Sequence, residues 1–160
     1  MHSPKMLALA LAALVLVACN PFRRDPVTEV SRDANINSRW QARLVTPATL
    51  VGAVQMNGSA TMQPSSDNES TELSLNVANA TPGGVHPWQV HRGQCGSDDG
   101  VFGSSEAYKP IKVGDKGRGE ATATVPMIMP TTGSYYVTVS ASAANADTEV
   151  ACGNLAPPAQ

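Results

Sequence analysis

The chain has 160 residues, which is enough for one domain with a hydrophobic core and short segments outside it. Charged residues make up only 15% of the sequence and the formal net charge is −2, a balance that disfavours nucleic acid as a partner. Gly and Pro number 13 and 12, which favours short strands joined by turns over long helices.

Residues 1–18 have the layout of a bacterial secretion signal. Lys5 supplies a positive charge, and residues 6–18 form an unbroken apolar run. The run is too short for a stable transmembrane helix and suits the hydrophobic region of a signal peptide. It ends in Leu-Val-Ala directly before Cys19, which resembles the bacterial lipoprotein processing motif. The resemblance implies cleavage before Cys19, acylation of its thiol and amine, and a stable lipid anchor.

The segment after Cys19 indicates where the protein is held. By resemblance to lipoprotein sorting, Asn20 rather than Asp at the next position favours the outer membrane. We therefore expect a protein of the bacterial cell envelope, lipid-anchored at the periplasmic face of the outer membrane. An ordinary secretion signal with an incidental cysteine is the alternative. Residues 19–38 mix prolines and charges without a sustained apolar period, which predicts a flexible tether.

Residues 39–155 carry the pattern of an all-β domain. Trp40, Ala42 and Leu44 alternate with polar residues, as half-buried strands do, and residues 72–77 repeat this alternation. Further strands are expected over residues 50–54, 59–63, 85–91, 111–113, 121–125, 135–139 and 150–155. Such a series of short strands predicts an antiparallel sandwich or flattened barrel. Residues 156–160 form a tail.

Turn signals separate these strands. Asn57-Gly58 predicts a two-residue hairpin turn. Residues 64–70, 82–84 and 114–119 are polar or glycine-rich and are interpreted as further turns. Residues 96–108 predict a loop, in which Asp98-Asp99-Gly100 is a turn and lacks the remaining ligand spacing of a calcium loop.

Two cysteines remain once Cys19 is acylated. Cys95 and Cys152 then form an even pair in an oxidising compartment, which predicts a disulfide bond. The alternative is a pair of thiols that helps to bind a metal ion.

The motifs around these cysteines resemble those of the Cu/Zn superoxide dismutases. Residues 85–91 contain His86 and His91, Cys95 follows, and Ala151-Cys152-Gly153 closes the domain. The family has a His-Gly-Phe-His-Val-His strand, then a cysteine, and a C-terminal Ala-Cys-Gly. The resemblance covers residues 40–155 and implies a Greek-key β-barrel or sandwich, with a disulfide that pins a loop to the last strand.

The chain departs from this family at the copper ligands. Alternate residues of a strand share a face, so Trp88 and Val90 point one way while Gln89 and His91 point the other. The second face is where the family binds copper. Gln89 occupies the first ligand position, and Ser140 lies near the place of a later ligand histidine. These two residues are therefore interpreted as degenerate ligand positions.

The remaining family features also differ. His86 matches a histidine that ties loops together without binding copper, and no histidine follows Cys95, so the zinc ligands are missing. Glu149 stands where the family has the arginine that attracts superoxide, and a carboxylate there repels an anionic substrate. One imidazole is too few donors for redox copper. We expect no dismutase activity and no catalytic residues.

Three side chains remain as weak metal candidates. Met127 and Met129 share a face if they lie on a strand, and their thioethers could hold Cu(I) together with His91. The other interpretation is that both methionines pack against the core.

Three functional hypotheses follow. The first is a non-catalytic binding or structural module without a cofactor, whose partner is an envelope protein or a small ligand. The second is a periplasmic copper-binding protein or a residual copper-dependent superoxide dismutase. The third is an interaction module that uses residues 96–108.

Overall fold

The computed structural model describes residues 39–158. The expected signal peptide, Cys19 and the expected tether lie outside the described residues, so the lipid anchor stays a prediction. No helix among residues 39–158 is long and apolar enough to cross a membrane.

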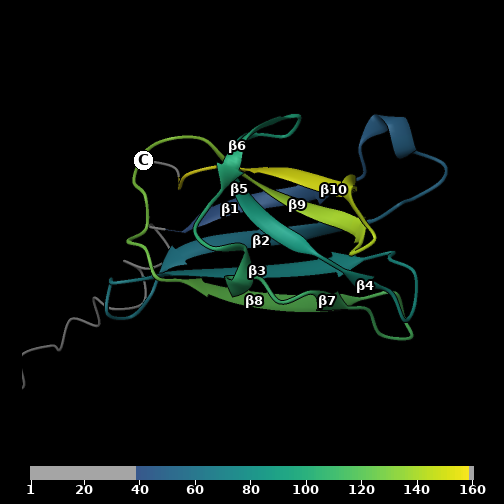
Figure 1. The fold of residues 1–160 in the computed structure, drawn as a ribbon, viewed down its shortest axis with the longest axis horizontal. Helices are drawn as coiled ribbons and strands as arrows, with labels where there is room; N and C mark the ends of the chain where they lie inside the picture. Colours follow the sequence, from purple (N-terminus) through teal and green to yellow (C-terminus); the bar gives the residue numbers. More distant parts are fainter. Residues whose placement is uncertain (1–38, 159–160) are drawn as a thin grey trace, which may run out of the picture.

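Eight antiparallel strands form one sheet that curls into a half-barrel, as Figure 1 shows. Along the sheet their order is β6-β5-β9-β10-β1-β2-β3-β8. The strands are β1 (Trp40–Val45), β2 (Asn57–Pro64), β3 (Thr71–Ala78), β5 (Trp88–Gln94), β6 (Ser97–Val101), β8 (Gly119–Val125), β9 (Tyr135–Ser142) and β10 (Asn145–Leu155). A small second sheet pairs β4 (Val85–His86) with β7 (Ile111–Lys112), and two short 3-10 helices are η1 (Ala48–Leu50) and η2 (Ser105–Ala107).

The sheet has a Greek-key connection. β1, β2 and β3 are consecutive neighbours, and β10 returns from the far end of the chain to lie beside β1. Longer connections, such as those from β3 to β5 and from β8 to β9, join strands that are not neighbours in the sheet. The all-β, antiparallel prediction is therefore confirmed.

The core follows the alternation that was expected from the sequence. Trp40, Ala42 and Leu44 of β1 are buried, as are the apolar residues of β3. On β5, Trp88 and Val90 are buried, whereas Gln89 and His91 are half-buried. The buried indole nitrogen Nε1 of Trp88 donates to the Lys109 carbonyl oxygen at 2.8 Å, so the one polar atom of that side chain is satisfied.

The expected hairpin turn at Asn57-Gly58 is wrong. Both residues lie in β2 and pair with β1 on one side and β3 on the other. A side chain at Gly58 would collide with the backbone carbonyl of Asn76 in β3. The glycine is therefore explained by the close approach of two strands and not by a turn.

Three other local predictions need correction. Residues 50–54 form the end of η1 and a turn closed by an isolated bridge, not a strand. The expected loop 96–108 contains β6 and η2, and Asp98, Asp99 and Gly100 lie in β6. The expected strand 85–91 is divided into β4 and β5 at Pro87, which has no N–H to donate to a ladder.

Candidate functional site

The candidate site is the outward face of β5, β9 and β10, where the copper-ligand pattern falls. The register between these strands is defined by direct pairing of Cα partners. It sets the relevant residues in three rows: Ser140 with Glu149, then Gln89 with Thr138 and Cys152, and then His91 with Tyr136 and Asn154.

His91 is fixed on this face by two neighbours. Its Nδ1 atom lies 2.9 Å from Oδ1 of Asp98, which comes from the adjacent strand β6. The imidazole also packs on the Tyr136 ring, with the two ring centroids 5.3 Å apart and the planes tilted by 32°. Only 12% of the His91 side chain is exposed. One ring nitrogen and one ring face are thus already engaged.

The site carries negative charge around a buried hydroxyl. The pKa of Asp98 is lowered because its carboxylate accepts from the Gly100 N–H, at 2.7 Å, and interacts with His91. Burial raises the pKa of Tyr136 to about 12, and the carboxylates of Asp98, Glu149 and Asp99 add to the shift. Such a field repels an anionic substrate such as superoxide.

Ser140 and His86 are linked through the backbone. Nδ1 of His86 lies 3.0 Å from the carbonyl oxygen of Ser140, and the His86 side chain is buried, so this contact ties β4 to β9. The hydroxyl of Ser140 donates to the Ala146 carbonyl at 2.8 Å. At this position of the outward face, the chain therefore offers a short hydroxyl that is already hydrogen-bonded.

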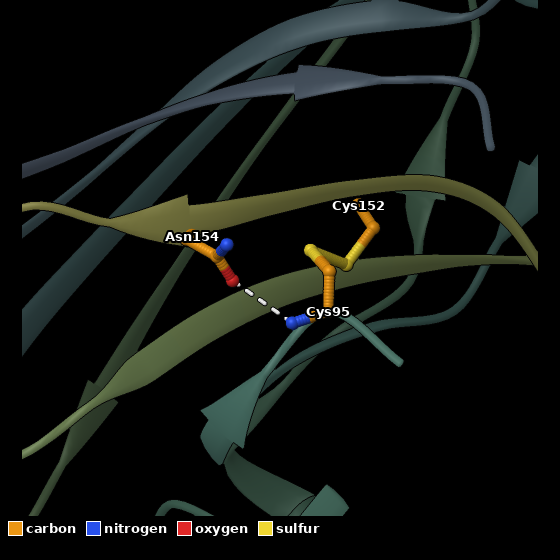
Figure 2. The surroundings of a disulfide bond; sticks show 3 residues. All are labelled: Cys95, Cys152 and Asn154. Carbon is orange, nitrogen blue, oxygen red and sulfur yellow. Dashed lines mark hydrogen bonds between the residues drawn. A yellow bond between two sulfur atoms is a disulfide. The ribbon is translucent and has the colours of Figure 1, made fainter. Parts of the chain in front are cut away.

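The disulfide lies at the edge of the same face. Cys95 and Cys152 are joined with an S–S distance of 2.05 Å, and the backbone N–H of Cys95 donates to Oδ1 of Asn154 at 2.8 Å (Figure 2). The bond fixes the turn between β5 and β6 to β10. The pairing expected from the sequence is the one present, and it removes both thiols from metal binding.

The two methionines do not join His91. β8 ends at Val125, so Met127 and Met129 lie in the following connection and not on a strand. The carbonyl of Met127 accepts from the Thr71 hydroxyl of β3, and Met129 packs against the core. The expectation that both thioethers share a strand face is therefore wrong, because Pro126 follows the last residue of β8.

The arrangement as a whole is poor in metal donors. Within residues 39–158, no three His, Cys, Asp or Glu side chains are close enough together to hold a metal ion. Gln89 is half-buried beside Thr138 and presents a neutral amide on this face.

Two important members of the site were not identified from the sequence. The sequence predicts a turn at Asp98 and only a strand at Tyr136. The one available signal for Tyr136 was its position in β9, where its alternation with the core residue Val137 places it outward.

Comparisons with known proteins leave the family open. No protein-family model matches this sequence, and no curated protein matches it either.

Proposed function

We propose that this chain is a lipid-anchored protein of the cell envelope whose superoxide-dismutase-like domain acts as a non-catalytic binding or structural module. In this account the anchor is Cys19, the fold is retained from the enzyme family, and the copper and zinc sites are lost. The family likeness rests on the sequence motifs, with which the Greek-key sheet agrees.

The observation that carries the proposal is the state of His91. It is the one imidazole on the outward face of β5, β9 and β10, and Asp98 and Tyr136 already hold it. Gln89 and Ser140 add an amide and a hydroxyl, and neither group is a good donor for copper. A redox copper site needs several fixed nitrogen donors, and this face provides one.

The electrostatics support the same conclusion. Glu149 pairs directly with Ser140 in the strand register, and its charge contributes to the raised pKa of Tyr136. With Asp98 and Asp99 it makes three carboxylates whose charge acts on the Tyr136 hydroxyl. An enzyme that consumes an anion gains encounter rate from the opposite sign of charge.

A groove beside the disulfide offers a concave surface for a small ligand or a peptide. It has a volume of about 490 Å³ and is lined mainly by β1 and β10, with Cys95 and Gly96 at one side. Arg43 and Glu149 contribute charges of both signs, and Val45, which is 53% exposed, contributes apolar surface. Small-molecule sites combine apolar surface with a few polar groups in the same way.

Copper titration of the oxidised protein, followed by a dismutase assay, tests the proposal. We expect no binding of Cu(II), or of Cu(I) under a mild reductant that spares the disulfide, tighter than the micromolar range. Dismutase turnover should not exceed that of free copper at the same concentration. Tight, stoichiometric binding in either oxidation state would overturn the proposal and favour a copper-handling protein.

A further inference from the structure

The connection between β8 and β9 carries the most exposed large apolar side chain in residues 39–158. Ile128 is 74% exposed and its neighbour Met127 is 42% exposed. Both lie between Pro126 and Pro130, in a segment without regular structure. Single exposed apolar side chains are common on soluble proteins, so exposure alone assigns no role.

The position of this connection in the fold gives the second observation. Arg39, where the described chain begins, donates from Nε to Oε1 of Gln63 at 2.8 Å, near the end of β2. After the β2–β3 turn, the Thr71 hydroxyl at the start of β3 donates to the Met127 carbonyl at 2.8 Å. The chain therefore enters the domain at the same end of the sheet as the Met127–Ile128 segment, the left end in Figure 1.

The separation between these two points is small. Three strand spacings lead from β1 through β2 and β3 to β8, which amounts to about 14 Å across the sheet. The point where the chain enters the domain is thus close to Met127 and Ile128.

We propose that this end of the domain faces the lipid bilayer and that Ile128 and Met127 insert among the lipid headgroups as a second membrane contact. This inference rests on the proposed lipid anchor at Cys19. The occupant of the apolar surface is the lipid of the membrane in which the anchor is held.

Because the lipid anchor already holds the domain near the membrane, a contact of only two apolar side chains is sufficient to orient it. The sequence predicts a flexible tether over residues 20–38, and a flexible chain of that length spans about 25 Å. The domain is therefore held at an effective concentration in the millimolar range near the surface. Two apolar side chains are too weak to recruit a free protein to a membrane, but they are enough to orient a tethered one.

The acidic residues at this end of the domain determine which lipid headgroups it can contact. Asp67 and Glu69 lie in the β2–β3 turn at this same end. The pKa of Asp67 is lowered, mainly by the Ser65 hydroxyl and then by the Glu69 N–H, so its carboxylate is charged at neutral pH. Anionic headgroups repel such a turn. The contact is therefore with zwitterionic headgroups, and added anionic lipid weakens it.

Site-specific fluorescence in vesicles tests the inference. The full lipidated protein is placed in phosphatidylethanolamine–phosphatidylcholine vesicles after Ile128→Cys substitution and labelling with an environment-sensitive dye. The new thiol is the one free thiol when Cys19 is acylated and Cys95 is bonded to Cys152. Lys116→Cys, in the exposed turn before β8 at the opposite end, is the matched control.

Lipid-borne nitroxide should quench the Ile128 dye several-fold more than the Lys116 dye, and aqueous iodide should show the reverse order. Equal quenching of the two dyes in vesicles that carry the protein overturns the inference and leaves the anchor intact. Shielding of Ile128 in native membranes but not in protein-free vesicles also overturns it, and assigns the segment to a protein partner. Failure of the protein to float with vesicles refutes the anchor itself.

Discussion

Nδ1 of His91 lies 2.9 Å from Oδ1 of Asp98, and this pair defines the chemistry of the outward face. The same carboxylate oxygen accepts from the Gly100 N–H, so β6 presents Asp98 in a fixed orientation. An imidazole held in this way is a structural side chain that joins two neighbouring strands. The contact with Asp98 thus gives His91 a role that requires no metal ion.

Asp98→Asn should lower the pKa of Tyr136 from about 12 toward its ordinary value of 10, because the negative charge that disfavours the tyrosinate is removed. Nuclear magnetic resonance titration of labelled tyrosine rings measures the change. Asp99→Asn is the matched control and should shift the Tyr136 pKa less, because the charge of Asp99 contributes least. An unchanged pKa in the Asp98 variant would contradict the effect of the Asp98 charge on Tyr136.

The protein should lose stability above pH 10. Burial raises the pKa values of both Tyr136 and Tyr108 in the folded state. The unfolded chain therefore releases these protons first, and the stabilisation is present below pH 10 and lost as pH rises through the folded values. Denaturant midpoints measured at pH 8, 10 and 11 should fall in that order. Tyr136→Phe should flatten the decline, and an equally steep decline in that variant would refute the assignment.

Cys152→Ser should destabilise the domain strongly. The two cysteines are 57 residues apart in sequence, and closing such a loop stabilises the folded state by about 4 kcal/mol in the chain-entropy model. Cys95→Ser should have the same effect, and the double variant should be no worse than either single one. Denaturant unfolding under non-reducing conditions is the measurement. Loss of less than about 1 kcal/mol would show that the bond contributes little.

Gly58→Ala should cost about 1–3 kcal/mol, because the added methyl group meets the Asn76 carbonyl and forces β2 and β3 apart. Ser59→Ala, at the next and exposed position, is the control and should change stability by less than about 0.5 kcal/mol. Equal effects of the two substitutions would contradict the close strand contact.

Cys19→Ser should move the protein from the membrane fraction to the soluble periplasmic fraction, because no acyl chain can then be attached. Fractionation of cells that express the full chain is the measurement. Continued association with membranes after high-salt washing would refute the lipid anchor.

The core strands were predictable because their apolar residues repeat with period two. In β1 and β3 every second residue is buried, and the alternation in the sequence is sufficient to place them. β6 was not predictable in this way. Its first three residues, Ser97, Asp98 and Asp99, are all exposed, and the strand exists because it pairs with the edge of β5. Tertiary pairing there overrides a composition typical of turns.

The candidate site was likewise predictable only in part. Alternation on β5 predicted that Gln89 and His91 leave the core, and the structure agrees. The partner of His91 could not be predicted, because it depends on the register between β5 and β6, which contains an irregularity between His91 and Gly93. The prediction of a hairpin turn at Asn57-Gly58 was wrong for a related reason. In the sequence, a glycine that permits close strand packing cannot be distinguished from a glycine in a turn.

Restoring the missing ligands tests the central claim most directly. Gln89 and His91 are two residues apart on one strand face, and Ser140 is the diagonal neighbour of Gln89 on β9, so the Gln89 side chain starts within about 7–8 Å of each of the other two. Ser140 and His91 lie two rows apart, about 13 Å along the strands. The Gln89→His, Ser140→His double variant should bind Cu(II) at least about tenfold more tightly than the natural chain, a gain of about 1.4 kcal/mol. The control double variant, Thr122→His with Thr124→His on the exposed face of β8, should gain less. The measurement is isothermal titration of the natural chain and both variants with Cu(II). Tight copper binding by the natural chain would contradict a degenerate copper site on this face. So would a Gln89→His, Ser140→His variant that binds copper no more tightly than the control variant.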